Sequence, residues 1–202
     1  MLDQLLKEVA ACRICRDAPQ FPPALPHEPR PVIRVSHTVR ICVCGQAPGT
    51  KVHASGLPFD DRSGDRLRDW MGVTRNQFYD VSRIGTVPMG FCFPGQDAKG
   101  GDLPPRRECC ALWHDRVFAA LPQVELVLTI GQYAHAYHLG SARKASLTDT
   151  VKAWRQIYRR GDAHRYIPLP HPSWRNTGWL KKNTWFEEDL LPVLRAEVGA
   201  LL

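Results

Sequence analysis

Two buried apolar runs, each ending in a short loop, constrain the fold of this chain more than any other feature. Residues 41–44 (ICVC) lead into the loop GQAPG at 45–49, and residues 166–170 (YIPLP) lead into His171, Pro172 and Ser173. Short apolar runs bounded by turn residues are typical of strands buried in a parallel sheet. Since ligands bind beyond the carboxyl ends of such strands in an open α/β fold, we expect both loops to face one pocket.

The rest of the chain alternates between the apolar spacing of strands and that of helices. It predicts strands at 40–44, 78–81, 83–89, 124–130 and 165–169, loops at 45–59 and 95–105, and helices at 1–11, 63–71 (with Ser63 as N-cap), 105–121, 132–139, 147–158 and 185–202. This alternation is typical of a three-layer α/β/α fold with a mostly parallel sheet between helices. Six prolines between residues 19 and 31 exclude a helix or a central strand there. We therefore expect one domain over residues 1–202, with residues 19–37 as a proline-rich surface linker within it.

The charge and hydropathy of the chain indicate a soluble globular protein with an anionic partner. The formal net charge is +7, the sequence pI is about 9.2 and the mean hydropathy is −0.31. No apolar run reaches the roughly 20 residues that span a bilayer, and the N-terminus lacks the long apolar segment of a secretory signal, so we expect a cytoplasmic protein. Basic residues cluster beside the two loops, which favours contact with a phosphate backbone.

Seven cysteines in a cytoplasmic chain favour metal ligation or buried thiols over disulfides. Cys12 and Cys15 form a C-x-x-C pair at the end of a predicted helix, while Cys92 and the pair Cys109 and Cys110 flank a glycine-rich loop. Four thiolates from these positions can hold Zn²⁺ or a [4Fe–4S] cluster, and ligand chemistry leaves both open, as well as unligated thiols. The other two are interpreted as small hydrophobic residues on one face of a strand: Cys42 and Cys44.

In this order, the motifs resemble those of the uracil-DNA glycosylase superfamily, in particular its iron–sulfur branch, the family 4 type. GQAPG at 45–49 with GLPF at 56–59 is similar to the first motif of the family, and HPS at 171–173 to the second. The resemblance covers nearly the whole chain and implies a four-stranded parallel sheet between helices. It also implies a [4Fe–4S] cluster on Cys12, Cys15, Cys92 and Cys109, with Cys110 as the alternative fourth ligand and Zn²⁺ as the alternative metal. The activity it implies is monofunctional hydrolysis of the N-glycosidic bond of deoxyuridine in DNA, by a monomer that acts on nucleoid DNA and leaves an abasic site.

The same resemblance implies roles for individual side chains. The target base must leave the DNA stack, and its departure places negative charge on the base and positive charge on the sugar. His171 is expected to donate a hydrogen bond to uracil O2, and Phe59 to stack on the base. The other expected pocket residues are Gln46, Ala47, Pro48, Gly49 and Ser173, and the expected DNA contacts are Trp174, Arg175, Lys181 and Lys182.

Two departures from the family pattern leave open which residue positions the attacking water and which base is recognised. The best-known members position the attacking water with an Asp where this chain has Ala47, so we hypothesise that Asp60 or Asp61, with His53, replaces that carboxylate. Asp61 also suits the N-terminus of the following helix. The base-reading Asn of the family is absent from the strand that carries Thr86. Hypoxanthine or a mismatched pyrimidine is therefore an alternative substrate, and a weakly catalytic protein that binds uracil or abasic-site DNA is an alternative function.

Overall fold

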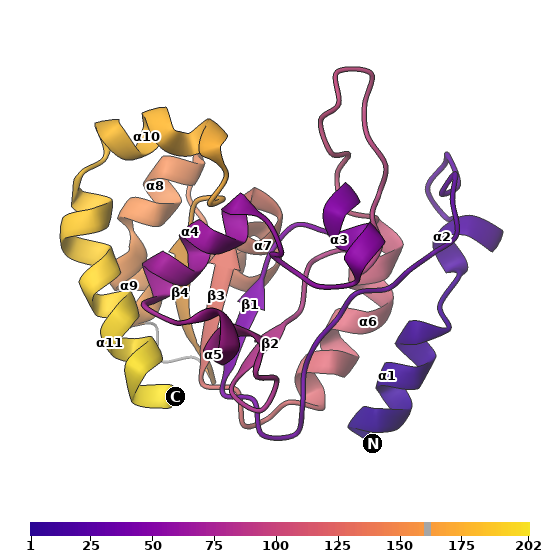
Figure 1. Ribbon diagram of the computed structural model, residues 1–202, viewed down its shortest axis with the longest axis horizontal. Coiled ribbons are helices and arrows are strands. Elements are labelled where there is room, and N and C mark those ends of the chain that lie inside the picture. Colours follow the sequence, from indigo (N-terminus) through magenta and orange to yellow (C-terminus); the bar gives the residue numbers. More distant parts are fainter. Residues whose placement is uncertain (160–162) are drawn as a thin grey trace.

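A four-stranded, all-parallel sheet with the strand order β2-β1-β3-β4 forms the centre of the protein (Figure 1). The computed structural model describes residues 1–159 and 163–202. β1 (Ile41–Cys44) pairs with β2 (Ile84–Thr86) on one side and with β3 (Leu126–Ile130) on the other, and β4 (Arg165–Leu169) completes the sheet beside β3. The predicted α/β class and its four parallel strands are confirmed.

Helices cover both faces of this sheet. One layer packs on Ile41 and Val43 and contains α4 (Arg62–Met71), α5 (Arg75–Tyr79), α8 (Leu147–Lys152), α9 (Trp154–Tyr158) and α11 (Leu191–Leu201). The other packs on Cys42 and Cys44 and contains α1 (Leu2–Ala10), α6 (Arg107–Ala119) and α7 (Gly131–Leu139). The two cysteines share one face because side chains alternate along a strand, which confirms their predicted role as small core residues.

Shorter elements connect these layers. They are α2 (Ile14–Asp17), α3 (Thr50–Ser55), α10 (Thr177–Lys182), the 3₁₀ turns Gly140–Ala142 and Trp174–Asn176, and a π-helical turn at Phe186–Leu190. The predicted helix at 147–158 is thus two helices, and the one at 185–202 begins with a π turn. No helix in the described part of the chain is long and apolar enough to cross a membrane.

Three local predictions are wrong. The predicted strand at 78–81 begins inside helix α5, because Thr74 and Gln77 form a reciprocal capping box that starts a helix there. The predicted loop at 45–59 contains the helix α3. The N-cap of α4 is Asp61 rather than Ser63, and its carboxylate accepts the Gly64 N–H at 2.9 Å.

The proline-rich segment is tied to the core at several points. Leu25 and Val32 are buried, and the Phe21 N–H donates to the carboxylate of Glu108 on α6. Arg106 donates to the carbonyl of Pro23 at 2.8 Å. The segment forms no helix, as its prolines predict, and it covers the start of α6.

The chain connectivity places the ends of three strands at one edge of the sheet. The connection that leaves β1 runs to β2 on one side, while β3 lies on the other side of β1, so β1 stands at the point where the strand order reverses. Open α/β sheets bind ligands in the crevice outside such a point. The loops that follow β1, β2 and β4 all open into this crevice.

Candidate active site

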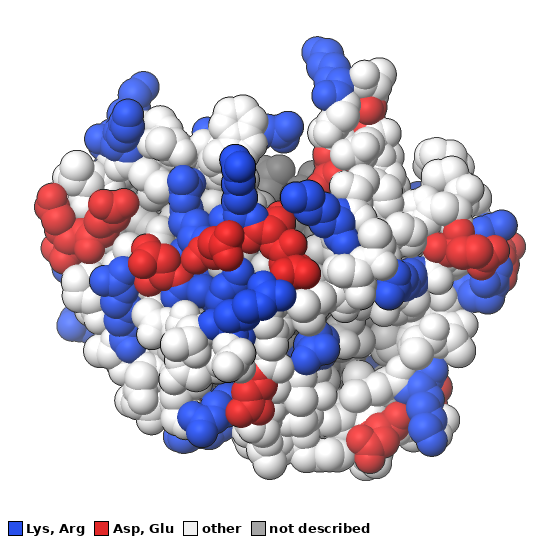
Figure 2. Space-filling model, viewed as in Figure 1, with Lys and Arg blue, Asp and Glu red and all other residues white. Residues whose placement is uncertain are grey.

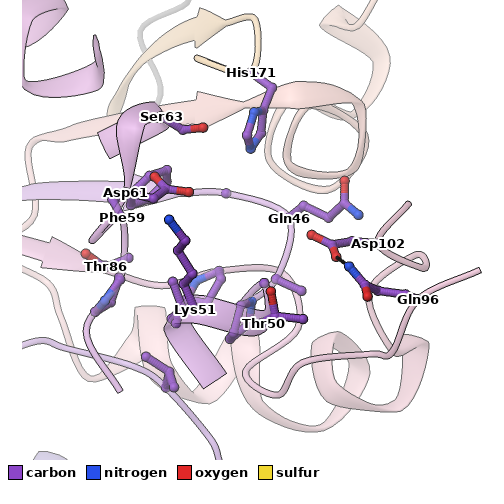
Figure 3. Close-up of a pocket in the computed structure, with 18 of the residues that line it drawn as sticks. Gln46, Thr50, Lys51, Phe59, Asp61, Ser63, Thr86, Gln96, Asp102 and His171 are labelled. Atoms are coloured by element: carbon purple, nitrogen blue, oxygen red, sulfur yellow. Dashed lines mark hydrogen bonds between the residues drawn. The ribbon is translucent and has the colours of Figure 1, made fainter. Parts of the chain in front are cut away.

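A cavity of about 320 Å³ lies beyond the carboxyl ends of the strands (Figure 3). The two loops expected to face each other both line it. Its walls include Gly45, Gln46, Ala47, Pro48, Gly49, Lys51, Phe59, Asp61, Ser63, Thr86, Gln96, Asp102, His171 and Arg175. It opens into an outer hollow, which shares part of this lining and adds Arg62, Ser173 and Trp174.

Phe59 forms one wall of the cavity and is held in an unusual backbone conformation. Its φ is 55°, in the left-handed region that costs a non-glycine residue about 1–3 kcal/mol. The buried Arg68 donates to its carbonyl at 3.1 Å, and a Cβ on Gly64 would stand only 1.7 Å from that same oxygen. A Cβ on Gly45 would lie 3.3 Å from the Phe59 ring. Two glycines and one arginine thus fix the ring as a flat wall beside the first loop.

His171 follows β4 and points its ring into the cavity (Figure 3). The Ser173 N–H donates to its Nδ1 at 3.2 Å, so in the neutral ring the proton is on Nε2. Burial lowers the pKa of His171, although Asp61 and Asp102 act in the opposite direction. Asn176 fixes the backbone by donating to the His171 carbonyl at 2.7 Å. The residue is therefore a neutral imidazole that presents an N–H donor to the cavity.

Of the three residues proposed to replace the missing carboxylate, the structure brings only Asp61 to the cavity. Asp61 lies at the start of α4 and lines both the cavity and the outer hollow. Its neighbour Asp60 points elsewhere and pairs with Arg75 at 2.8 Å. His53 packs its ring against His27, with ring centroids 4.8 Å apart, and lies outside the cavity lining.

A hairpin at residues 95–103 supplies further polar groups that the sequence did not single out. Gln96 and Asp102 form an isolated antiparallel bridge across it, and both line the cavity. The Asp97 carboxylate accepts the N–H groups of Lys99 and Gly101 at 2.8 and 2.9 Å and closes the turn. The segment was predicted as a loop, and its only sequence signal is a set of glycines around two aspartates.

The outer hollow is bordered by basic and aromatic side chains. Trp174 is 73% exposed, and the Arg175 guanidinium lies 5.9 Å from the centre of its ring. Arg66 on α4 holds the segment that carries Trp174 and Arg175, because its guanidinium donates to the Ser173 carbonyl at 3.0 Å. Figure 2 shows Lys and Arg side chains on both sides of the hollow, over α4 and α10 on one side and on the hairpin on the other. The remaining two predicted contacts, Lys181 and Lys182, end α10 and lie outside the hollow's lining.

Four of the cysteines line a second, small cavity between α2, the segment after β2 and the start of α6. They are Cys12, Cys15, Cys92 and Cys109, whereas Cys110 lies outside it. Burial raises the pKa of the Cys92 thiol to about 12 and raises those of Cys15 and Cys109 as well. Within the described residues, no three His, Cys, Asp or Glu side chains converge closely enough to hold a single metal ion.

The fold and the cavity define a class of protein: an α/β/α domain that binds its ligand between loops at the carboxyl edge of a parallel sheet. Residues 33–195 match the uracil DNA glycosylase superfamily, and the chain belongs to this superfamily. It is accordingly a DNA glycosylase, a hydrolase of base excision repair that acts on DNA. The match includes Cys92 and Cys109 and begins after Cys12 and Cys15.

Proposed function

We propose that the protein removes uracil from DNA by hydrolysing its N-glycosidic bond, and that it leaves an abasic site without cutting the strand. The observation that carries the proposal is the arrangement of three groups around one cavity. A flat aromatic wall (Phe59), a neutral N–H donor (His171) and a carboxylate (Asp61) all face it. The aromatic wall can stack on a base, the N–H donor can stabilise the negative charge on the departing base, and the carboxylate can stabilise the sugar cation.

The cavity and the outer hollow suit the two parts of a flipped nucleotide. A flipped base needs a narrow pocket with a stacking surface, and its sugar and phosphates need room and positive charge. The cavity, with Phe59 as its flat wall, supplies the first. The hollow, with Arg62, Ser173 and Arg175, supplies the second, and Trp174 is exposed at its edge, where it can contact neighbouring bases. Lys181 and Lys182 extend the positive charge beyond the hollow.

The chemical step follows from charge. As the bond between C1′ and the base breaks, its electron pair leaves with the base, and the Nε2–H of His171 donates to the uracil oxygen that gains charge. Asp61 faces the positively charged sugar and holds the water that adds to C1′. The His171 donor is neutral before the reaction, so it stabilises the departing anion without transferring a proton to it.

We also propose that Cys12, Cys15, Cys92 and Cys109 hold a [4Fe–4S] cluster, as some members of the superfamily do. The four thiols line one buried cavity, and placing four thiolates there requires compensating positive charge. A single Zn²⁺ would need all four sulfurs about 3.8 Å apart, given a Zn–S bond of about 2.3 Å. A [4Fe–4S] cluster takes one thiolate at each of its four irons, so its four sulfur ligands need not converge on one metal ion. When bound, the cluster would tie the N-terminal segment to α6, and no catalytic step passes through it.

Another deaminated base is the second candidate substrate, because Thr86 and Pro88 line the cavity where the family carries a base-reading Asn. A cavity of about 320 Å³ leaves room for a purine such as hypoxanthine. Ala47, which stands where the best-known members carry an Asp, is the feature that supports another alternative function: a protein that binds uracil or abasic-site DNA and excises the base weakly. A panel of duplexes with uracil, hypoxanthine or an abasic site distinguishes these functions.

The proposal predicts base release from a uracil duplex under single-turnover conditions, with strand cleavage that depends on added alkali. His171→Ala removes the donor to the departing base, and we expect it to lower the excision rate about 10²–10³-fold with little change in DNA affinity. Strand cleavage without alkali would contradict the monofunctional assignment. Release of hypoxanthine but not uracil would contradict the proposed substrate and assign hypoxanthine in its place.

A further inference from the structure

The hairpin at residues 95–103 carries a second carboxylate to the cavity, opposite the first. In Figure 3, Asp61 and Asp102 stand on facing walls, with the His171 ring above them and the Lys51 side chain entering from below. Both carboxylates line the cavity and also the outer hollow. They therefore stand at the boundary between the part that suits a base and the part that suits a sugar, which is where the C1′ bond of a bound nucleotide would lie.

Asp102 lies directly against the first loop. Its Oδ2 is 3.2 Å from the position that a Cβ on Gly49 would occupy. The loop itself holds the hairpin, because the Gln46 side chain donates to the Leu103 carbonyl at 3.2 Å, one residue beyond Asp102. The first loop, which carries Ala47 and no acid, thus gains a carboxylate from a segment some fifty residues later in the chain.

The hairpin is a built structure that sets the direction of this side chain. The Leu103 N–H donates to the Gly95 carbonyl at 2.9 Å, and the Asp97 N–H to the Gly101 carbonyl at 2.8 Å. Gln96 donates from its Nε2 to Asp102 Oδ1 at 3.3 Å, which leaves Oδ2 on the side of the first loop. Hydrogen bonds along the hairpin therefore hold Asp102 beside the cavity.

The two carboxylates differ in their partners. Asp61 uses Oδ1 to cap α4 by accepting the Gly64 N–H. The side-chain partner of Asp102 in the described structure is a neutral amide, Gln96, and Asp102 is exposed to solvent. The charged and titratable groups that line these spaces with both carboxylates are Lys51, His171, Arg175 and, in the outer hollow alone, Arg62. Lys51 and Arg175 provide the positive charge that allows two carboxylates to line one site.

We propose that Asp102 is a catalytic residue of this glycosylase and the general base for the attacking water; this inference rests on the proposed function. The water oxygen bonds to C1′ as the bond from C1′ to the base breaks, and the electron pair of that bond leaves with the base. The Asp102 carboxylate takes the proton that the water loses. Asp61 faces the sugar cation, and His171 donates to the departing base.

Single-turnover excision with matched hairpin variants tests this role. Asp102→Asn keeps the size of the side chain and an acceptor for Gln96, and we expect it to lower the excision rate constant at least 100-fold while DNA affinity changes less than threefold. Asp97→Asn is the control, because it removes the same charge from the same hairpin and keeps an oxygen for the turn; we expect excision within threefold of wild type. Formate added to Asp102→Ala should restore part of the rate constant, since it can replace a base but not a structural contact.

Three results would overturn the inference. If Asp102→Asn excises uracil within threefold of wild type, Asp102 is not the general base. If Asp97→Asn slows excision as much as Asp102→Asn, and formate has no effect on Asp102→Ala, the hairpin acts only through its structure. In both cases wild-type protein still releases uracil, so the proposed function stands. If the wild-type protein releases no base from any duplex of the panel, both proposals fall.

Discussion

At the scale of single residues, the direction of each side chain decides which of several similar groups lies in the cavity. Asp60 and Asp61 are adjacent in the chain, yet one pairs with Arg75 outside the cavity and the other caps α4 at its wall. The sequence predicts that an acid follows Phe59, but it does not separate these two. That separation depends on where the first turn of α4 begins, because consecutive side chains at a helix N-terminus point in different directions.

The pair offers a matched test of the proposed catalytic carboxylate. Asparagine is as good an N-cap as aspartate, so Asp61→Asn should leave the stability of α4 nearly unchanged while it lowers the single-turnover rate constant about 10²-fold or more. Asp60→Asn loses an exposed ion pair with Arg75, and such pairs contribute little to stability, so this variant should excise like wild type. Equal rates for both variants would remove Asp61 from the mechanism. A large loss in Asp60→Asn alone would reverse the assignment.

At the scale of elements, the sequence predicts what local patterns determine and misses what long-range docking determines. Buried strands and the loops that follow them are read from short apolar runs, and the structure has both loops on one cavity. Helix α5 was missed because its aromatic residues favour strands, although the capping box of Thr74 and Gln77 was a local signal. The contribution of the hairpin to the cavity has no local signal, since the bond from Gln46 to Leu103 joins segments 57 residues apart.

The same distinction applies to the cysteines, where spacing left Cys109 and Cys110 as alternatives. The two are adjacent on α6, and successive helical residues point about 100° apart. Cys109 therefore lines the cavity that also contains Cys12, Cys15 and Cys92, while Cys110 lies outside it. This geometry favours Cys109 as the fourth ligand of the proposed cluster.

Serine substitutions at the two positions test the cluster and its ligand together. We expect wild-type protein and Cys110→Ser to be brown and to contain about four irons per chain, as a [4Fe–4S] cluster requires. Cys109→Ser should lose most of its iron and unfold at a lower temperature, because the cluster no longer joins the N-terminal segment to α6. Colourless wild-type protein with stoichiometric zinc would contradict the cluster. Iron loss in Cys110→Ser alone would contradict the assigned ligand.

At the scale of the whole molecule, the helical layer formed by α1, α6 and α7 buries titratable groups. His114 on α6 is fully buried and stacks on Phe91, with ring centroids 5.3 Å apart. His135 on α7 is 1% exposed, and one of its ring nitrogens lies 3.0 Å from the Thr129 carbonyl. Burial lowers the pKa of each to about 4, although nearby backbone carbonyls act in the opposite direction. Both rings are therefore neutral in the folded protein at pH 7.

These buried histidines predict that the fold loses stability in mild acid. An unfolded histidine takes up its proton near pH 6.5, whereas the folded ones do so near 4, so the stabilisation is complete above pH 6.5 and is lost as the pH falls toward 4. From pH 7 to pH 5, each should lower the free energy of unfolding by about 2 kcal/mol, because the slope approaches about 1.4 kcal/mol per pH unit. Urea unfolding at the two pH values measures the loss.

A substitution of His114 tests its part in this acid sensitivity. His114→Phe keeps an aromatic ring against Phe91 and removes the titrating group, so its loss between pH 7 and pH 5 should be about 2 kcal/mol smaller than that of wild type. An equal loss in His114→Phe and wild type would show that His114 does not cause the acid sensitivity.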